Sequence, residues 1–172
     1  MAILPKGSLN PFGAPVLVSK ILANSITVTE GDSVKFASGF VALGTTGALV
    51  AGHVTSIVTD KGVGLNTTGA VGAEMGSFVG TYLTASNNQT VGKVRATIDI
   101  SKETLYSAEE DAAIGTTTGS NLMGYFQDLT DEDTLDESTA ATSAAQYFGW
   151  GVDPNNSANA LVNIYESQVF GV

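Results

Sequence analysis

The sequence contains no cysteine. Disulfide bonds, thiolate metal ligands and a cysteine nucleophile are therefore excluded, while the redox compartment is left open. His53 is the single histidine, so any catalytic triad or histidine-rich zinc site would have to be built around that one side chain. The fold must be stabilised by packing, hydrogen bonding or assembly.

Basic residues are also few. Seven Lys and Arg stand against 17 Asp and Glu, which gives a formal net charge of -10. Such a charge repels a phosphate backbone, and the basic residues are scattered singly without forming a stripe, so nucleic acid is not expected as a partner. The acidity serves solubility or favours docking onto a basic surface.

No segment has the pattern of a signal peptide or a membrane-spanning helix. The first residues lack a basic region followed by an apolar run, and Pro5 interrupts them. The longest weakly polar stretch, residues 40–57, is broken by glycine, threonine and His53. We therefore expect a soluble protein with no membrane partner.

The sequence motifs of common enzymes are missing as well. There is no G-x-S-x-G nucleophile elbow, no phosphate-binding P-loop, and no G-x-G-x-x-G following a strand. Adjacent acids such as Glu109 and Glu110 usually serve helix capping and solvation, not the cleavage of glycosidic bonds. We predict no catalytic residue, no cofactor and no enzymatic activity.

The dominant pattern consists of short apolar runs separated by Gly, Asn and Asp. Alternating polar and apolar side chains, together with β-branched and aromatic residues, predict β-strands in these runs. The candidate strands are residues 16–18, 25–29, 33–36, 40–43, 49–51, 53–59, 77–84, 93–100, 124–129, 146–152 and 160–166. Since no long helical period appears, we predict an all-β fold that is either a sandwich or barrel-like.

One short helix is expected near residues 107–115. Ser107 followed by Glu110 matches a capping box, in which the serine accepts a hydrogen bond from a helical amide and the glutamate reaches back. Apolar residues follow, and Gly115 provides a stop.

The first 14 residues differ in composition from the rest of the chain. Pro5, Gly7, Pro11 and Gly13 exclude a helix or a central strand there. We predict an extended N-terminal arm over residues 1–14.

Residues 15–172 form one predicted β domain, because no boundary is visible within them. Residues 130–145 are polar and acidic and are expected to form an exposed connection. An EF-hand loop starting at Asp131 would place Asp136 where glycine is required and Thr142 where the bidentate glutamate belongs. No metal site is therefore predicted.

The arm carries apolar side chains where an exposed terminus would normally be polar. Either a partner covers them or the arm packs on its own domain. The candidate binding residues of the arm are Ile3, Leu4, Pro5, Pro11 and Phe12. Tyr147 and Trp150 are further candidates, because large aromatic residues anchor interfaces, although such residues more often belong to the core.

Several stretches of the chain have a familiar pattern. They are Gly31-Asp32-Ser33-Val34, Gly124-Tyr125-Phe126-Gln127-Asp128-Leu129, Thr134-Leu135-Asp136-Glu137, Gly149 to Asp153, and Leu161-Val162-Asn163-Ile164. Together they resemble the head decoration (cement) proteins of tailed phages. The resemblance implies a compact β domain, often trimeric, that sits on the outer surface of the capsid. It also implies binding to the major capsid protein, with arms that clamp neighbouring subunits.

The resemblance and the composition together predict a structural virion protein and homo-oligomer that stabilises the assembled capsid by binding only that state. Two other functions stay open. One is another virion component, such as a tail-tube or fibre-base protein. The other is a carbohydrate-binding β-sandwich with Trp150 or Tyr147 as the platform for a sugar.

Overall fold

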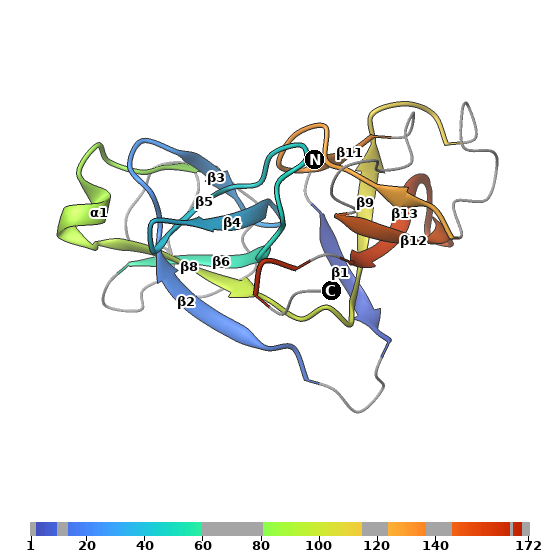
Figure 1. The fold of residues 1–172 in the computed structure, drawn as a ribbon, viewed down its shortest axis with the longest axis horizontal. Coiled ribbons are helices and arrows are strands. Elements are labelled where there is room, and N and C mark those ends of the chain that lie inside the picture. Colours follow the sequence, from blue (N-terminus) through green and yellow to red (C-terminus); the bar gives the residue numbers. More distant parts are fainter. Residues whose placement is uncertain are drawn as a thin grey trace.

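The computed structural model describes residues 3–9, 14–59, 81–114, 124–136, 146–165 and 167–169. Two main β-sheets lie side by side (Figure 1). Each sheet has its own cluster of buried apolar side chains. The predicted all-β class is confirmed. The first described strand and the described strands from residue 104 onward belong to one sheet, and most of the strands between them in the sequence build the other.

The sheet that contains both ends of the chain is called sheet A. Its pairings are antiparallel apart from one short parallel strand, β11, which lies beside β9. In spatial order the strands are β1 (Leu4–Ser8), β9 (Thr104–Glu110), β13 (Asn156–Ile164), β12 (Tyr147–Asp153) and β10 (Phe126–Gln127), with β11 (Thr134–Leu135) on β9.

The other main sheet, sheet B, is barrel-like. Its antiparallel order is β2 (Leu17–Ile21), β8 (Val94–Asp99), β6 (Gly52–Thr59), β4 (Ser33–Ala37) and β5 (Phe40–Leu43). At one end the first and last strands meet, because Leu22 bridges Val41 and the Ala23 N–H donates to the Val41 carbonyl at 2.7 Å. A separate pair of strands, β3 (Thr27–Thr29) and β7 (Thr81–Leu83), completes the described strands.

The side-chain alternation of β8 explains how sheet B covers its core. Val94, Ala96 and Ile98 are buried, while the intervening Arg95 and Thr97 are partly exposed. Successive side chains of a strand point to opposite faces, so this apolar set packs on one side of the sheet. The same alternation was visible in the sequence over residues 93–100.

The helix expected near residues 107–115 is wrong as placed. Residues 104–110 are strand β9, in which Ser107 pairs with Leu4 of β1 on one side and Leu161 of β13 on the other. A ladder on both sides satisfies the backbone of this segment more fully than a single helical turn, and it overrides the local capping pattern. Gly115 lies outside the described residues.

The helix that the described residues do contain is a single turn, α1 (Asn88–Val91). The buried side chain of Asn88 donates to the carbonyls of Leu22 and Val94 and accepts the Val94 N–H, which ties this turn to sheet B. Gly92 follows with a φ of 63°, a left-handed conformation that glycine adopts without strain. Over the described ranges, no helix has the length and apolar character needed to cross a membrane.

The predicted acidic connection at residues 130–145 is in part a strand of sheet A. Thr134 and Leu135 pair with Glu109 and Glu110 of β9, and Leu135 is fully buried. Residues 137–145 lie outside the described residues.

Candidate functional site

His53 lies at the junction between the two sheets. Its backbone pairs with Ser33 and Asp99 within sheet B. Its side chain is only 1% exposed, and Nε2 lies 2.9 Å from the hydroxyl oxygen of Tyr147 in sheet A. The Tyr147 hydroxyl is also 2.7 Å from Ser33 Oγ, and the His53 ring is tilted against Tyr106, with centroids 3.9 Å apart. These contacts join the cores of the two sheets.

Burial keeps the rings of this junction uncharged. It lowers the pKa of His53 to about 3, although the charge of Asp99 opposes the shift. It also raises the pKa of Tyr106 and of Tyr147 above their ordinary values. At neutral pH the chemistry available to these groups is therefore hydrogen bonding between the sheets.

Two glutamine side chains reinforce the junction. Gln146 donates from Nε2 to the carbonyls of Thr45, at 3.0 Å, and Ala48. Gln168 Nε2 donates to the Phe36 carbonyl at 2.8 Å, while the Phe36 N–H donates to Gln168 Oε1 at 2.5 Å. Both glutamines lie near the C-terminal end of the chain and both bind backbone of the N-terminal half. These hydrogen bonds join the C-terminal part of the chain to the backbone of its N-terminal half.

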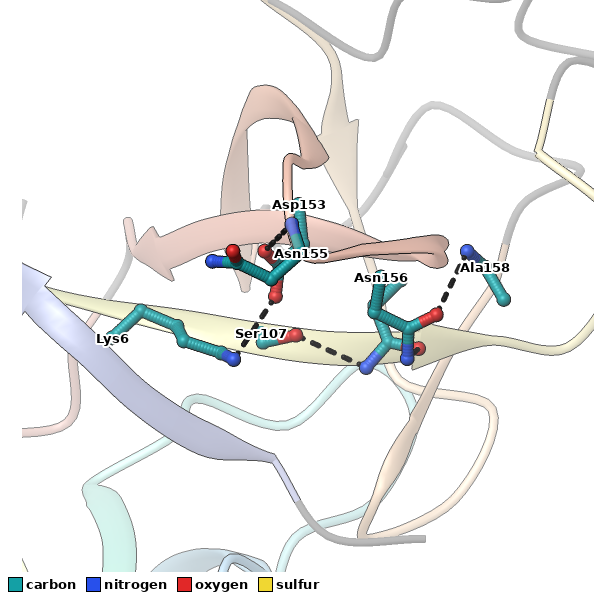
Figure 2. A network of polar contacts seen from close by, with 7 residues as sticks. Lys6, Ser107, Asp153, Asn155, Asn156 and Ala158 are labelled. Carbon is teal, nitrogen blue, oxygen red and sulfur yellow. Dashed lines mark hydrogen bonds and ion pairs between the residues drawn. The ribbon is translucent and has the colours of Figure 1, made fainter.

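A buried carboxylate anchors the N-terminal strand to sheet A. Figure 2 shows Lys6 of β1 reaching toward Asp153, with Nζ and Oδ2 separated by 3.3 Å. Hydrogen bonds from the Ser107 hydroxyl and the Asn155 backbone N–H, together with Lys6, lower the pKa of Asp153. Asn159 Nδ2 donates to Ser107 Oγ at 3.1 Å, which extends the network into β13. Strand β1 is therefore linked to the β12–β13 hairpin across β9.

The arm residues named from the sequence have different positions in this arrangement. Ile3 is fully buried in the core of sheet A. Leu4 pairs with Ser107 through the backbone of β1, and Pro5 is exposed on the same strand. Pro11 and Phe12 lie outside the described residues. Over residues 3–9 the arm packs on its own domain, and capsid binding by these residues stays a prediction.

The two candidate interface aromatics point to opposite sides of sheet A. Tyr147 is fully buried in the junction. Trp150 is 38% exposed, and its ring contacts Phe148 edge to face, with centroids 5.1 Å apart. The indole N–H donates to Asn163 Oδ1 at 2.7 Å, which holds the ring in one orientation. Only Trp150 of this pair presents a ring to a partner.

A cleft of about 660 Å³ lies where β1, the segment leading into β2 and the β8–β9 connection meet. Pro5, Pro15, Val16 and Leu17 contribute much of its apolar lining. Val16 is 48% exposed and Leu17 is 54% exposed, so this apolar surface is open to a partner.

The wall of the cleft is held by Asp99. Its Oδ1 accepts the Ser101 N–H at 2.9 Å, and its Oδ2 accepts the Thr104 hydroxyl at 2.8 Å. Ser101 Oγ in turn accepts the Val16 N–H at 2.6 Å. Sequence reasoning missed this cleft, because Val16 and Leu17 carry only the pattern of a strand and their exposure depends on how distant segments meet.

No protein-family model, curated protein or solved structure matches this chain. Within the described part of the chain, no three His, Asp or Glu side chains are gathered as a metal ion would require. The fold is an all-β arrangement with two joined main sheets, and two exposed features of its described residues are the cleft beside Leu17 and the aromatic ring of Trp150.

Proposed function

We propose that this protein is a structural virion component that binds the major capsid protein on the outer surface of an assembled phage head and stabilises the shell. The observation that carries the proposal is the exposed apolar cleft at Val16 and Leu17 on an otherwise strongly acidic molecule. Exposed contiguous apolar surface is typical of interaction sites. The sequence stretches that resemble decoration proteins support the same function.

The rigid junction between the sheets also supports this function. His53, Gln146 and Gln168 hold the two sheets together, so surfaces on both sheets are presented at a constant distance from each other. A protein of this kind can contact neighbouring subunits of a lattice without first ordering itself. Because it would bind the assembled shell and not the dissociated subunits, binding would add to shell stability by mass action.

The test is co-sedimentation with assembled capsids of the phage that encodes the chain. We expect saturable binding to assembled shells, no binding to the unassembled major capsid protein, and a higher disassembly temperature for decorated shells.

Deletion of residues 1–14 is a poor probe, because it would also remove Ile3 from the core and β1 from sheet A. The matched pair of point variants Leu17→Lys and Leu83→Lys is better, since both side chains are exposed and only Leu17 lines the cleft. Failure of the wild-type chain to bind any such shell would reject the proposal.

A carbohydrate-binding function is the second candidate, favoured by the exposed and oriented ring of Trp150. Aromatic rings provide flat apolar faces on which a partner can stack. Trp150 is the single tryptophan of the chain, so its fluorescence reports on this site alone. A saturable, glycan-dependent change in that fluorescence would favour this function, and an unchanged spectrum across a glycan panel would reject it.

A further inference from the structure

Among the described residues, one backbone edge of strand β2 is open over Leu17 to Ser19. Its described strand partner is β8, in a ladder that pairs Leu17 with Asp99 and Ser19 with Thr97. The flanking residues show which groups face that partner: Ile100 N–H donates to the Val16 carbonyl at 2.9 Å, and Leu22 N–H donates to the Val94 carbonyl at 3.2 Å. Even-numbered residues of β2 therefore direct their backbone groups toward β8.

Odd-numbered residues of β2 direct their backbone groups the other way, because these directions alternate along an antiparallel ladder. At the far end of the strand this outward direction is used, since Ala23 N–H donates to the Val41 carbonyl of β5. At Leu17 and Ser19 no described strand lies on that side. The open part of the edge thus offers the N–H and C=O groups of these two residues.

The open edge borders the apolar cleft. Leu17 belongs to both, and Val16 and Pro15 continue the cleft lining toward Pro5 of β1. Side chains of a strand added beside Leu17 and Ser19 would have the exposed apolar surface of Val16 and Leu17 to pack on. Edge strands are natural templates for such additions, and the ladder of β2 contains no bulge from Leu17 to Ile21.

We propose that the open edge of β2 accepts an extended apolar segment of the capsid protein as an added strand. Backbone donors and acceptors at the spacing of a strand are satisfied by another extended backbone, and the apolar cleft takes one of its side chains. A second copy of this chain is disfavoured at this edge by the repulsion between two molecules of charge -10, so the homo-oligomer predicted from the sequence would form through another face. The source of the segment rests on the proposed function, whereas the edge itself follows from the geometry of β2.

Two variants of one residue separate backbone pairing from side-chain contact. Ser19→Pro removes an N–H that faces away from β8, so it leaves the sheet B ladder intact, while Ser19→Ala keeps that N–H. We expect Ser19→Pro to weaken co-sedimentation with assembled capsids about tenfold or more, and Ser19→Ala to bind like the wild type. Thermal unfolding of both free variants checks that they are folded.

Amide hydrogen exchange of the wild-type chain gives an independent readout that needs no substitution. We expect the amides of Leu17 and Ser19 to exchange freely in the unbound protein and to become protected on capsids. If Ser19→Pro does not fold, two results still test strand addition at β2. They are the protection of these amides on capsids and the loss of capsid binding by Leu17→Lys but not by the control Leu83→Lys.

The outcomes separate this inference from the proposed function. Capsid binding with unprotected Leu17 and Ser19 amides would overturn the inference and leave the function standing. A concentration-dependent dimer that Ser19→Pro abolishes would identify a second copy as the occupant and also overturn it. No capsid binding by the wild type would overturn both the function and the assignment of the segment to a capsid protein.

Discussion

The hydroxyl oxygen of Tyr147, in sheet A, lies 2.9 Å from Nε2 of His53, in sheet B, although 94 residues separate them in the chain. The same hydroxyl is bonded to Ser33 Oγ, so one buried oxygen serves two groups of the opposite sheet. Unpaired polar groups in a protein interior are costly, and this arrangement therefore couples the stability of the two sheets. We expect them to unfold in one cooperative transition.

Tyr147→Phe removes that shared hydroxyl and leaves His53 Nε2 and Ser33 Oγ without their partner. We expect the free energy of unfolding to fall by about 1–3 kcal/mol, as measured by urea denaturation. Tyr125→Phe is the matched control, because Tyr125 is exposed, and it should leave the stability unchanged. Equal stability of the two variants would show that the junction hydroxyl contributes little.

His53 is expected to stay neutral in the folded protein at mildly acidic pH. Burial lowers its pKa to about 3, so the unfolded chain binds a proton more readily than the folded chain between that pH and the ordinary value of 6.5. The contribution of His53 to stability is therefore present above pH 6.5 and is lost as the pH falls toward 3. Nitrogen-15 NMR of this single imidazole measures its protonation directly, and a titration midpoint near 6.5 would contradict the prediction.

The pH dependence of stability that Asp32 contributes is expected to have the opposite sign to that of His53. Burial, together with the nearby Glu132 and Asp133, raises its pKa from 3.8 to about 7, although the Thr29 N–H opposes the shift. The folded state then binds a proton more tightly than the unfolded state. The stability that Asp32 contributes is fully present below about pH 4 and is lost as the pH rises through 7.

Asp32→Asn should therefore stabilise the protein at pH 8 relative to the wild type, by at least about 1.4 kcal/mol, the equivalent of one pKa unit. At pH 4 the two proteins should be nearly equal in stability. Denaturation curves at both pH values measure the difference, with Glu103→Gln as a control at an exposed acid. An Asp32→Asn effect that does not depend on pH would argue against a raised pKa.

Lys6→Met is expected to loosen the N-terminal strand, because the buried carboxylate of Asp153 loses its ion-pair partner. The cost should be about 1 kcal/mol, and it should appear as faster amide exchange in β1. Lys93→Met is the control, since Lys93 is exposed in a different part of the molecule. Unchanged exchange of the β1 amides would mean that the β9 ladder and the buried Ile3 hold the strand without the ion pair.

Local sequence patterns predicted the strands better than they predicted the helix. Val94, Ala96 and Ile98 alternate with polar residues, and they form a buried face as expected. Ser107 and Glu110 matched a helix start, yet they belong to strand β9, because partners on both sides of the strand satisfy its backbone. A capping pattern involves one turn of chain, whereas a sheet ladder gains hydrogen bonds along its whole length.

The candidate site was the least predictable part. The apolar residues of the arm were noticed in the sequence, but two interpretations fitted them, and the structure places Ile3 inside the core. Tyr147 and Trp150 looked alike as candidate interface aromatics, yet only Trp150 is exposed. Val16 and Leu17 gave no signal beyond a short strand.

The all-β class follows from the short alternating apolar runs and frequent turn residues of the chain, because the period of two is a local property of an extended chain. Three features became visible only in the folded chain: its division into two main sheets, the contact of Tyr147 with His53 between them, and the position of Leu17 at an edge that no described strand covers. These features depend on which strands pair over long separations, and strand pairing is set by the packing of the whole chain, not by any short segment of it.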